Sequence, residues 1–354
     1  MRKRYLILGC SVLLVLLIGS SQVTAQENTL LGISQMVTLA ISNNIQFKKA
    51  SYNLQNTKLE VKKIKAENLL NKSTIADLQK EITLLNQQNQ FQLEKDQLII
   101  KVVDDYFRIK MSEKDIESKQ KKVELEKIIL ADIEEQVTAG YSVDLDLLQQ
   151  GNEYYDALFD YQGSELSYKQ LLIEIKDRLG LEHDEEIRTS EMAIPDFPEI
   201  SLSESLEKAH KNSISLQSHK INVEKAQREL ESAKAGDLPE IEVLKLENNL
   251  GIAKLDNSLA EQELSYQLET QWMNYNQAKN DIILSQRSLQ QMKENETVIN
   301  RQVQAGLRSE EEELSATIGV LDAQSRLISS IRQVYQAYLE LQRMIGNLDE
   351  GYII

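Results

Sequence analysis

Residues 136–150 read QVTAGYSVDLDLLQQ, and residues 302–316 read QVQAGLRSEEEELSA. In each stretch a helical pattern runs into a glycine, Gly140 or Gly306, and another helical pattern begins a few residues later. A glycine is typical of this position because the residue after the last helical turn often takes a left-handed conformation. The sequence therefore predicts two equivalent turns between helices.

The chain also repeats itself outside these turns. Residues 33–50 align with residues 202–219, with serine, alanine and asparagine at matching positions. A closing glycine follows each turn at the same distance, so the spacing from Gly140 to Gly180 equals that from Gly306 to Gly346. Self-similarity of this kind predicts a duplicated unit of about 150 residues.

The predicted organisation follows from this repeat. We expect a first helical repeat at 26–181, a linker at 182–201 and a second helical repeat at 202–354. The linker contains two of the three prolines of the chain, Pro195 and Pro198, which are typical of a connecting segment.

Each half is predicted to hold three helices. In the first half we expect a first helix from a serine N-cap at Ser34 to about Ala66, a long second helix that ends at Ala139, and a third helix that starts at Val143. In the second half the first helix runs from Ser203 to about Ala235, the long helix ends at Ala305 and the third helix starts at Ser309. The long helices of about 65 residues would span roughly 95–100 Å at 1.5 Å per residue, so the two shorter ones could stack along each of them. Four apolar residues on the second long helix fall seven apart, and Val303 continues their register, which predicts a packing seam: Leu268, Tyr275, Ile282, Leu289 and Val303. The predicted fold class is therefore all-α, with long antiparallel coiled-coil helices.

Composition agrees with a helical protein and excludes some functions. Aromatic residues make up 5% of the chain, and only 13 glycines and 3 prolines occur, which is unusual for a β-rich protein. The formal net charge of −16 argues against nucleic-acid binding, which requires a basic face.

The N-terminus resembles a signal peptide. Residues 1–25 combine a basic start, an apolar run from Tyr5 to Gly19 and a small residue, Ala25, at the expected cleavage point. Two alternatives stay open, namely a lipid anchor on Cys10, the single cysteine, and retention of the uncleaved segment as a membrane anchor. Export to the cell envelope is expected in each case.

No catalytic or metal site is predicted. The three histidines, His183, His210 and His219, are interpreted as surface residues, because their spacing does not suit metal ligation. No glycine-rich phosphate loop or nucleophile elbow occurs, so we expect neither an enzyme nor a cofactor.

The order and spacing of these motifs resemble the outer-membrane efflux proteins of the TolC family. The likeness covers nearly all of residues 30–350 and rests on LGISQMVTLAISNN, on the two turn sequences and on KDRLGL. The resemblance implies a TolC-like α-helical barrel protomer, a homotrimer, a periplasmic adaptor (membrane fusion) protein as a partner, and an inner-membrane pump such as an ABC transporter.

The resemblance also assigns the turns to the adaptor-docking tips of the channel. The implied docking residues are Val137, Gly140, Tyr141, Ser142, Val303, Gly306, Leu307 and Arg308. Acidic residues follow each turn: Asp144, Asp146, Glu310, Glu311, Glu312 and Glu313. They are expected either to complement the helix dipoles or to form a carboxylate ring in a lumen that favours cations.

One departure from the family affects the predicted location. Family members carry a β-hairpin after the first helix of each half, whereas the corresponding slots here, AENLLNKSTIADLQ and KAGDLPEIEVLKLE, are too short for two spanning strands. We therefore expect little or no β-barrel, and a place in the periplasm, the wall or the cell surface instead of the outer membrane.

Two functions remain in view from the sequence. The first is an exported channel-tunnel-like component of an efflux or export system that gives a passive conduit. The second is an exported coiled-coil scaffold protein of the cell envelope with no conduit.

Overall fold

The computed structural model describes residues 30–348 except 72, 183 and 193. The signal-peptide prediction for residues 1–25 therefore lies outside the described residues. Helices occur in the order α1 Ile33–Asn43, α2 Ile45–Asn71, α3 Thr74–Thr138, α4 Asp144–Leu179, α5 Leu202–Asn212, α6 Ile214–Ala235, α7 Glu240–Gln304 and α8 Glu310–Ile345. The described residues contain no strand, only an isolated bridge between Leu31 and Thr189. The predicted all-α fold is confirmed.

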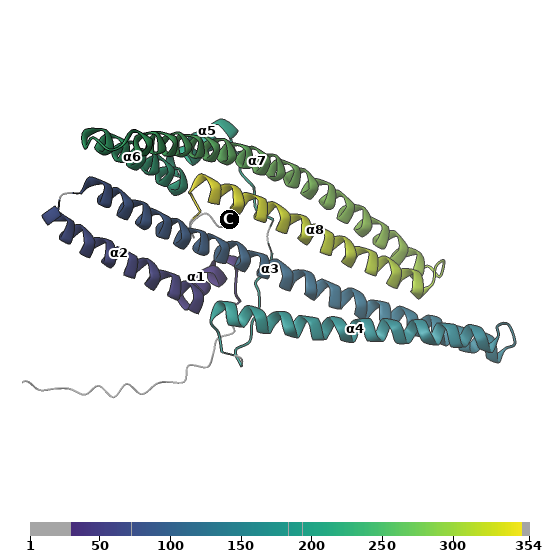
Figure 1. Ribbon diagram of the computed structural model, residues 1–354. Coiled ribbons are helices and arrows are strands. Elements are labelled where there is room, and N and C mark those ends of the chain that lie inside the picture. The colour runs from purple at the N-terminus through teal and green to yellow at the C-terminus, as the bar shows by residue number, and fades with distance from the viewer. Residues whose placement is uncertain (1–29, 72, 183, 193, 349–354) are drawn as a thin grey trace, which may run out of the picture.

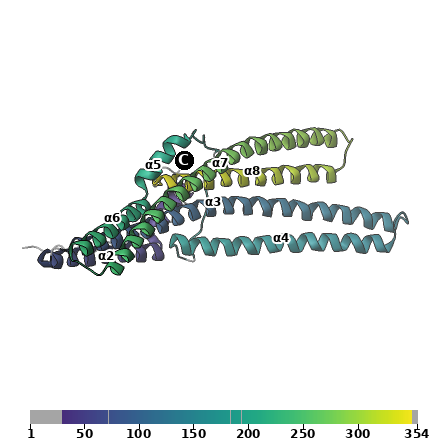
Figure 2. The ribbon, with the colours of Figure 1, turned by 45° about the horizontal axis from the view of Figure 1, so that its top comes forward.

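Two long helices, α3 and α7, run the length of an elongated molecule (Figures 1 and 2). Toward one end the neighbours follow the order α4, α3, α8, α7, and toward the other end they follow the order α2, α3, α6, α7. The shorter helices therefore stack along the long ones, as their lengths predict. In both orders α7 forms one edge of the layer, and α2 and α4 form the other.

Corresponding helices of the two halves have similar lengths. The helices α1 and α5 each hold 11 residues, α3 and α7 each hold 65, and α4 and α8 each hold 36. Only the second pair differs, with 27 residues in α2 and 22 in α6.

The single first helix predicted in each half is wrong, because a break divides it into two. Asn44 and Ser213 adopt extended backbone and each caps the helix that follows, with Asn44 Oδ1 accepting from the Phe47 amide at 3.0 Å. The predicted N-cap serines are also displaced, since Gly32 and Ser201 precede the first helices. A side-chain acceptor in extended backbone competes with the hydrogen bonds of the helix and so favours a break at this point.

The breaks bring each closing glycine against the start of its own half. Gly180 has φ of +65°, and a Cβ there would lie 2.6 Å from the Cβ of Asn43. Gly346 repeats this arrangement, with φ of +74° and a distance of 2.9 Å to the Cβ of Asn212. Glycine is therefore required at both positions by conformation and by space.

The main core lies at mid-length, where α1, α3, α4, α5, α7 and α8 meet the linker. Its fully buried side chains include Phe107, Ile175 and Tyr275. The linker is fastened to this core by Trp272 Nε1, which donates to the Ile200 carbonyl at 2.8 Å, and by Tyr275 Oη, which donates to the Pro198 carbonyl at 2.6 Å. The predicted seam residues Leu268, Tyr275 and Ile282 are buried.

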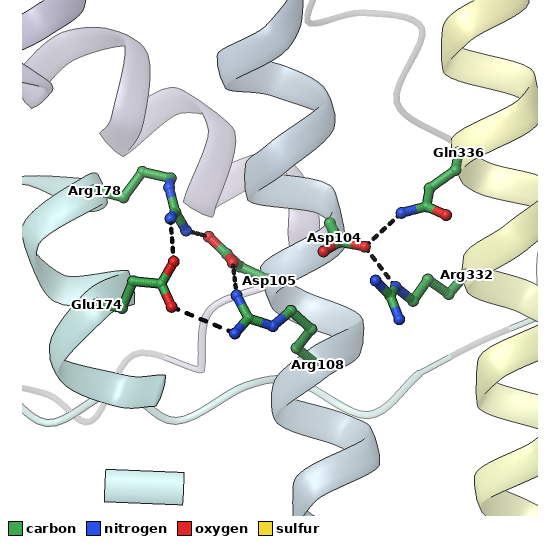
Figure 3. Close-up of polar contacts among 7 residues, drawn as sticks. All are labelled: Asp104, Asp105, Arg108, Glu174, Arg178, Arg332 and Gln336. Carbon is green, nitrogen blue, oxygen red and sulfur yellow. Dashed lines mark hydrogen bonds and ion pairs between the residues drawn. The ribbon is translucent and has the colours of Figure 1, made fainter. Parts of the chain in front are cut away.

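Two adjacent aspartates of α3 hold helices on opposite sides of it (Figure 3). Asp105 is fully buried and pairs with Arg178 of α4, while Arg108 Nη1 lies 3.1 Å from Asp105 Oδ1. Asp104 Oδ1 accepts from two α8 side chains, Arg332 Nε at 2.5 Å and Gln336 Nε2 at 2.6 Å. These contacts fix α4 and α8 on α3.

Candidate functional site

Both predicted turns form as helix C-caps with a left-handed glycine. Gly140 has φ of +77°, its amide donates to the Val137 carbonyl at 3.0 Å, and the Tyr141 amide donates to the Gln136 carbonyl at 2.8 Å. These two amides form hydrogen bonds with carbonyls of the last helical turn, which would otherwise have no partner within the helix.

The second turn repeats the first. Gly306 has φ of +70°, and its amide donates to the Val303 carbonyl at 2.8 Å, while the Leu307 amide donates to the Gln302 carbonyl at 2.8 Å. No atom lies within 4 Å of a Cβ built on Gly140 or Gly306, in contrast to the crowded closing glycines. Conformation alone therefore selects glycine at these two turns.

The two turns lie at the same end of the molecule (Figures 1 and 2). Each turn also exposes a large apolar side chain to solvent. Tyr141 is 86% exposed and Leu307 is 75% exposed. We call these turns, residues 137–142 and 303–308, the tips. A large apolar side chain left exposed at the end of each rigid hairpin is suited to a contact with another molecule.

Two of the six predicted acidic residues act as helix caps. Asp146 Oδ2 accepts from Ser142 Oγ at 2.6 Å and from the Val143 amide at 3.2 Å, and these bonds hold the pKa of Asp146 below its usual range. Glu312 accepts from the Ser309 amide at 3.2 Å and pairs with Arg308. These contacts match the dipole interpretation for Asp146 and Glu312.

The surroundings of a third acid, Glu311, disfavour its ionised form. Burial raises its pKa, and the Asp132 carboxyl of α3 adds to the shift. The carboxylate ring stays a prediction for all six acidic residues, Asp144, Asp146, Glu310, Glu311, Glu312 and Glu313.

One edge of the helix layer carries exposed apolar side chains at heptad spacing. On α4 they include Phe159, Leu166 and Ile173, which are 64%, 59% and 55% exposed, in register with Leu145. The α2 helix continues this edge with residues seven apart, Ile45, Tyr52 and Leu59. Such spacing places the side chains on one stripe of a helix, as in a coiled-coil seam.

The opposite edge, formed by α7, carries a matching stripe. Ile252, Leu259, Tyr266 and Met273 lie seven apart and are between 56% and 68% exposed. The other side of α7 is buried against α6 and α8, so α7 has two apolar flanks. We call the α2–α4 stripe the first edge and the α7 stripe the second edge.

Sequence reasoning assigned no residues to these edges. The signal was present in the heptad spacing from Leu145 to Ile173. Periodicity alone cannot separate it from the seam that faces α3, because both stripes lie on the same helix. The pair Asp104 and Asp105 was also missed, although two adjacent acids within the apolar run IIKVVDDYF are unusual.

The two histidines with described positions have separate surroundings. His210 Nε2 lies 2.9 Å from Ser265 Oγ, and His219 lines a groove between α6 and α7. His183 lies outside the described residues. Among the residues with described positions, no group of three or more His, Cys, Asp or Glu side chains could hold a metal ion. None of the helices in this part of the chain combines the length and apolar character of a membrane span.

Comparison with known proteins gives matches among solved structures alone. No family model and no curated protein matches the sequence. The Campylobacter jejuni CmeC outer membrane channel superposes with a TM-score of 0.66 at 12% identity, covering 90% of this chain and 87% of its own. The outer membrane protein VceC from Vibrio cholerae gives 0.64 at 10% identity, with coverage of 89% and 96%.

The open state of the Neisseria gonorrhoeae MtrE outer membrane channel gives a TM-score of 0.60 at 14% identity, covering 90% of each chain. The chain has a TolC-type channel fold. Within this TolC-type fold, the tips are the loops that join α3 to α4 and α7 to α8. The identity is too low for the comparison to carry more than the fold, so function rests on the edges and the tips.

Proposed function

We propose that the protein is an exported, envelope-located TolC-type conduit in which copies of the chain close into a ring around a lumen. The single observation that carries this proposal is the pair of exposed apolar edges on opposite sides of one helix layer. A layer with two different apolar edges can associate head to tail, so that the first edge of one copy contacts the second edge of the next. Such contacts form a closed ring when the rotation between neighbouring copies brings the last copy back to the first. The TolC-type fold makes a homotrimer the expected closure.

The apolar area at the edges supports this reading. Large aromatic and aliphatic side chains that are more than half exposed recur along α2, α4 and α7, whereas monomeric proteins seldom expose long contiguous apolar stripes. The energy for transport would come from a partner pump, because no catalytic group is proposed for this chain and the conduit is passive.

We propose further that the tips dock onto a periplasmic adaptor protein that connects the conduit to an inner-membrane pump such as an ABC transporter. The support is the exposure of Tyr141 and Leu307 at one end of the molecule, on turns whose glycines leave open space around them. Two such turns per chain would give a ring of alternating contacts at this end.

The conduit is tested by its shape. We expect the purified protein to have the mass of a trimer, and end-on particles in electron microscopy to show a central hole filled with stain. The alternative function, an envelope scaffold, is favoured by the long rod-like helices, and it predicts a solid or open bundle. A stable monomer would contradict the ring.

The docking proposal is tested at the tips. The double variant Tyr141→Asp with Leu307→Asp is expected to lower adaptor capture at least tenfold in a pull-down with a purified periplasmic adaptor protein of the same organism, because two apolar contacts per protomer are lost. The control is Gln290→Asp, an exposed position on α7 well away from the turns. Equal capture by the double variant and the control would remove the tips from the docking surface.

A further inference from the structure

A cleft lies where two stacked helices meet end to end. The helices α6 and α8 both pack between α3 and α7, with α8 ending at Ile345 and α6 beginning at Ile214. Asn212 Nδ2, just before α6, donates to the Ile345 carbonyl at 3.0 Å, and a cleft of about 590 Å³ lies beside this junction. The walls mix amides such as Asn89 and Gln267 with apolar side chains such as Leu264.

Three charged side chains line this cleft, and they differ in their interaction partners. Lys95 and Arg343 line it, but Lys95 has an interaction partner of its own and Arg343 Nε donates to Glu340 Oε2 at 2.7 Å. Asp96 also lines the cleft and is only 3% exposed.

The Asp96 carboxylate makes few direct contacts. Its Oδ1 accepts a hydrogen bond from Gln92 Nε2 at 2.8 Å, and no ion pair joins it to another residue that the structure describes. When a cation enters beside a buried carboxylate that has a single amide partner, the cation stabilises the ionised carboxylate considerably. We propose that this cleft binds a small organic cation, an amine or substituted ammonium compound, with Asp96 as its counter-charge.

The protonation behaviour of Asp96 agrees with this assignment. Burial raises its pKa to about 6, against the opposing effects of the Gln92 hydrogen bond and of the Arg343 and Lys95 charges. The charged groups that face it are Lys95 on α3 and Arg343 and Glu340 on α8, whereas the α5–α6 junction and α7 contribute only uncharged side chains to the cleft. A bound cation would therefore favour the ionised form, and acid would weaken binding.

The experiment compares three probes of one shape and different charge on the purified full-length protein. Benzylamine is cationic, benzyl alcohol is neutral and benzoate is anionic, and their affinities are measured by calorimetry at pH 7.5. We expect benzylamine to bind at least tenfold more tightly than either of the others. At pH 5 its affinity should fall about tenfold, because a carboxyl with a pKa near 6 is then largely protonated. Tighter binding of benzoate would overturn the proposal.

Variants separate the site from a general charge effect. Asp96→Asn keeps the shape and removes the charge, so the preference for benzylamine should disappear, and Asn89→Trp should block the cleft without changing its charge. Glu94→Gln is the matched control, because Glu94 lies on the same helix and bonds Gln90 instead of lining the cleft. Unchanged benzylamine affinity in Asp96→Asn would contradict the assignment. Since the site does not involve the tips or edges, this result is independent of the proposed conduit.

Discussion

The double variant Phe159→Glu with Leu166→Glu is expected to convert the assembled protein into monomers. Both side chains are exposed in the single chain, at 64% and 59%, and both lie on the first edge. In a closed ring they would be buried against α7 of the next copy. Losing two large apolar contacts removes about 3–6 kcal/mol from each interface, and burying two unpaired carboxylates adds a further cost. The association constant should fall by more than about a thousandfold.

Sedimentation velocity measures this change directly, and circular dichroism checks that the helices persist. Because the substituted side chains are exposed in the single chain, the melting of the protomer itself should change little. The control is Ser167→Glu, which adds one of these two negative charges at an exposed position one residue away from the stripe. A variant that still sediments as the wild-type assembly would show that the first edge is not an interface.

The second large effect is expected from Arg178→Ala at the polar cluster of Figure 3. Arg178 pairs with the fully buried Asp105 and donates to Glu174 Oε1 at 2.7 Å. Its removal leaves a buried carboxylate with Arg108 as its remaining ionic partner, which should lower the free energy of unfolding by about 3–5 kcal/mol. Adding Asp105→Asn should recover part of this loss, because the unpaired charge is then absent.

The pH dependence provides a second readout of the same cluster. Burial already raises the pKa of Asp105 above its ordinary value, although Arg178 opposes the shift. Without Arg178 the folded-state pKa rises further, so the ionised form is penalised more and the penalty disappears as pH falls through that value. The difference between wild type and Arg178→Ala in urea unfolding should therefore be smaller at pH 5 than at pH 8.

A surface ion pair serves as the control for this experiment. Arg188 and Glu186 lie 3.0 Å apart with side chains 51% and 65% exposed. Arg188→Ala should cost less than about 1 kcal/mol, since solvent screens exposed charges. A similar small loss for Arg178→Ala would mean that the buried pair does not hold α4 on α3.

Several features of the fold could be predicted from local sequence. The turns at Gly140 and Gly306 were identified because a left-handed C-cap depends on the glycine and its immediate neighbours. The lengths of α3 and α7 were predictable because a long, uninterrupted helical spacing of apolar residues indicates one continuous helix. The break at Asn44 was missed because a single capping side chain competes only weakly with helix propensity, and the packing against Gly180 decides the outcome.

The candidate sites depended more on tertiary structure. The tips were located by sequence, and the resemblance implied that both lie at one end of the molecule. The structure shows why: α3 and α7 run in the same direction along the layer, with α8 and α6 between them (Figure 1). The edges were not assigned, since Phe159 and Tyr275 both lie on heptad stripes, and only the packing leaves the first exposed and buries the second. The cleft at Asp96 was not predictable, as it is formed by the ends of two helices far apart in the chain.

The sequence by itself therefore determined the helical class, the two tip turns and the lengths of the long helices, because these depend on interactions between residues a few positions apart. The tertiary structure alone decided which apolar stripes become core and which become open edges, and which carboxylates are buried. Burial depends on which helices become neighbours, and helices with similar heptad stripes can be arranged in more than one order until the whole layer is assembled.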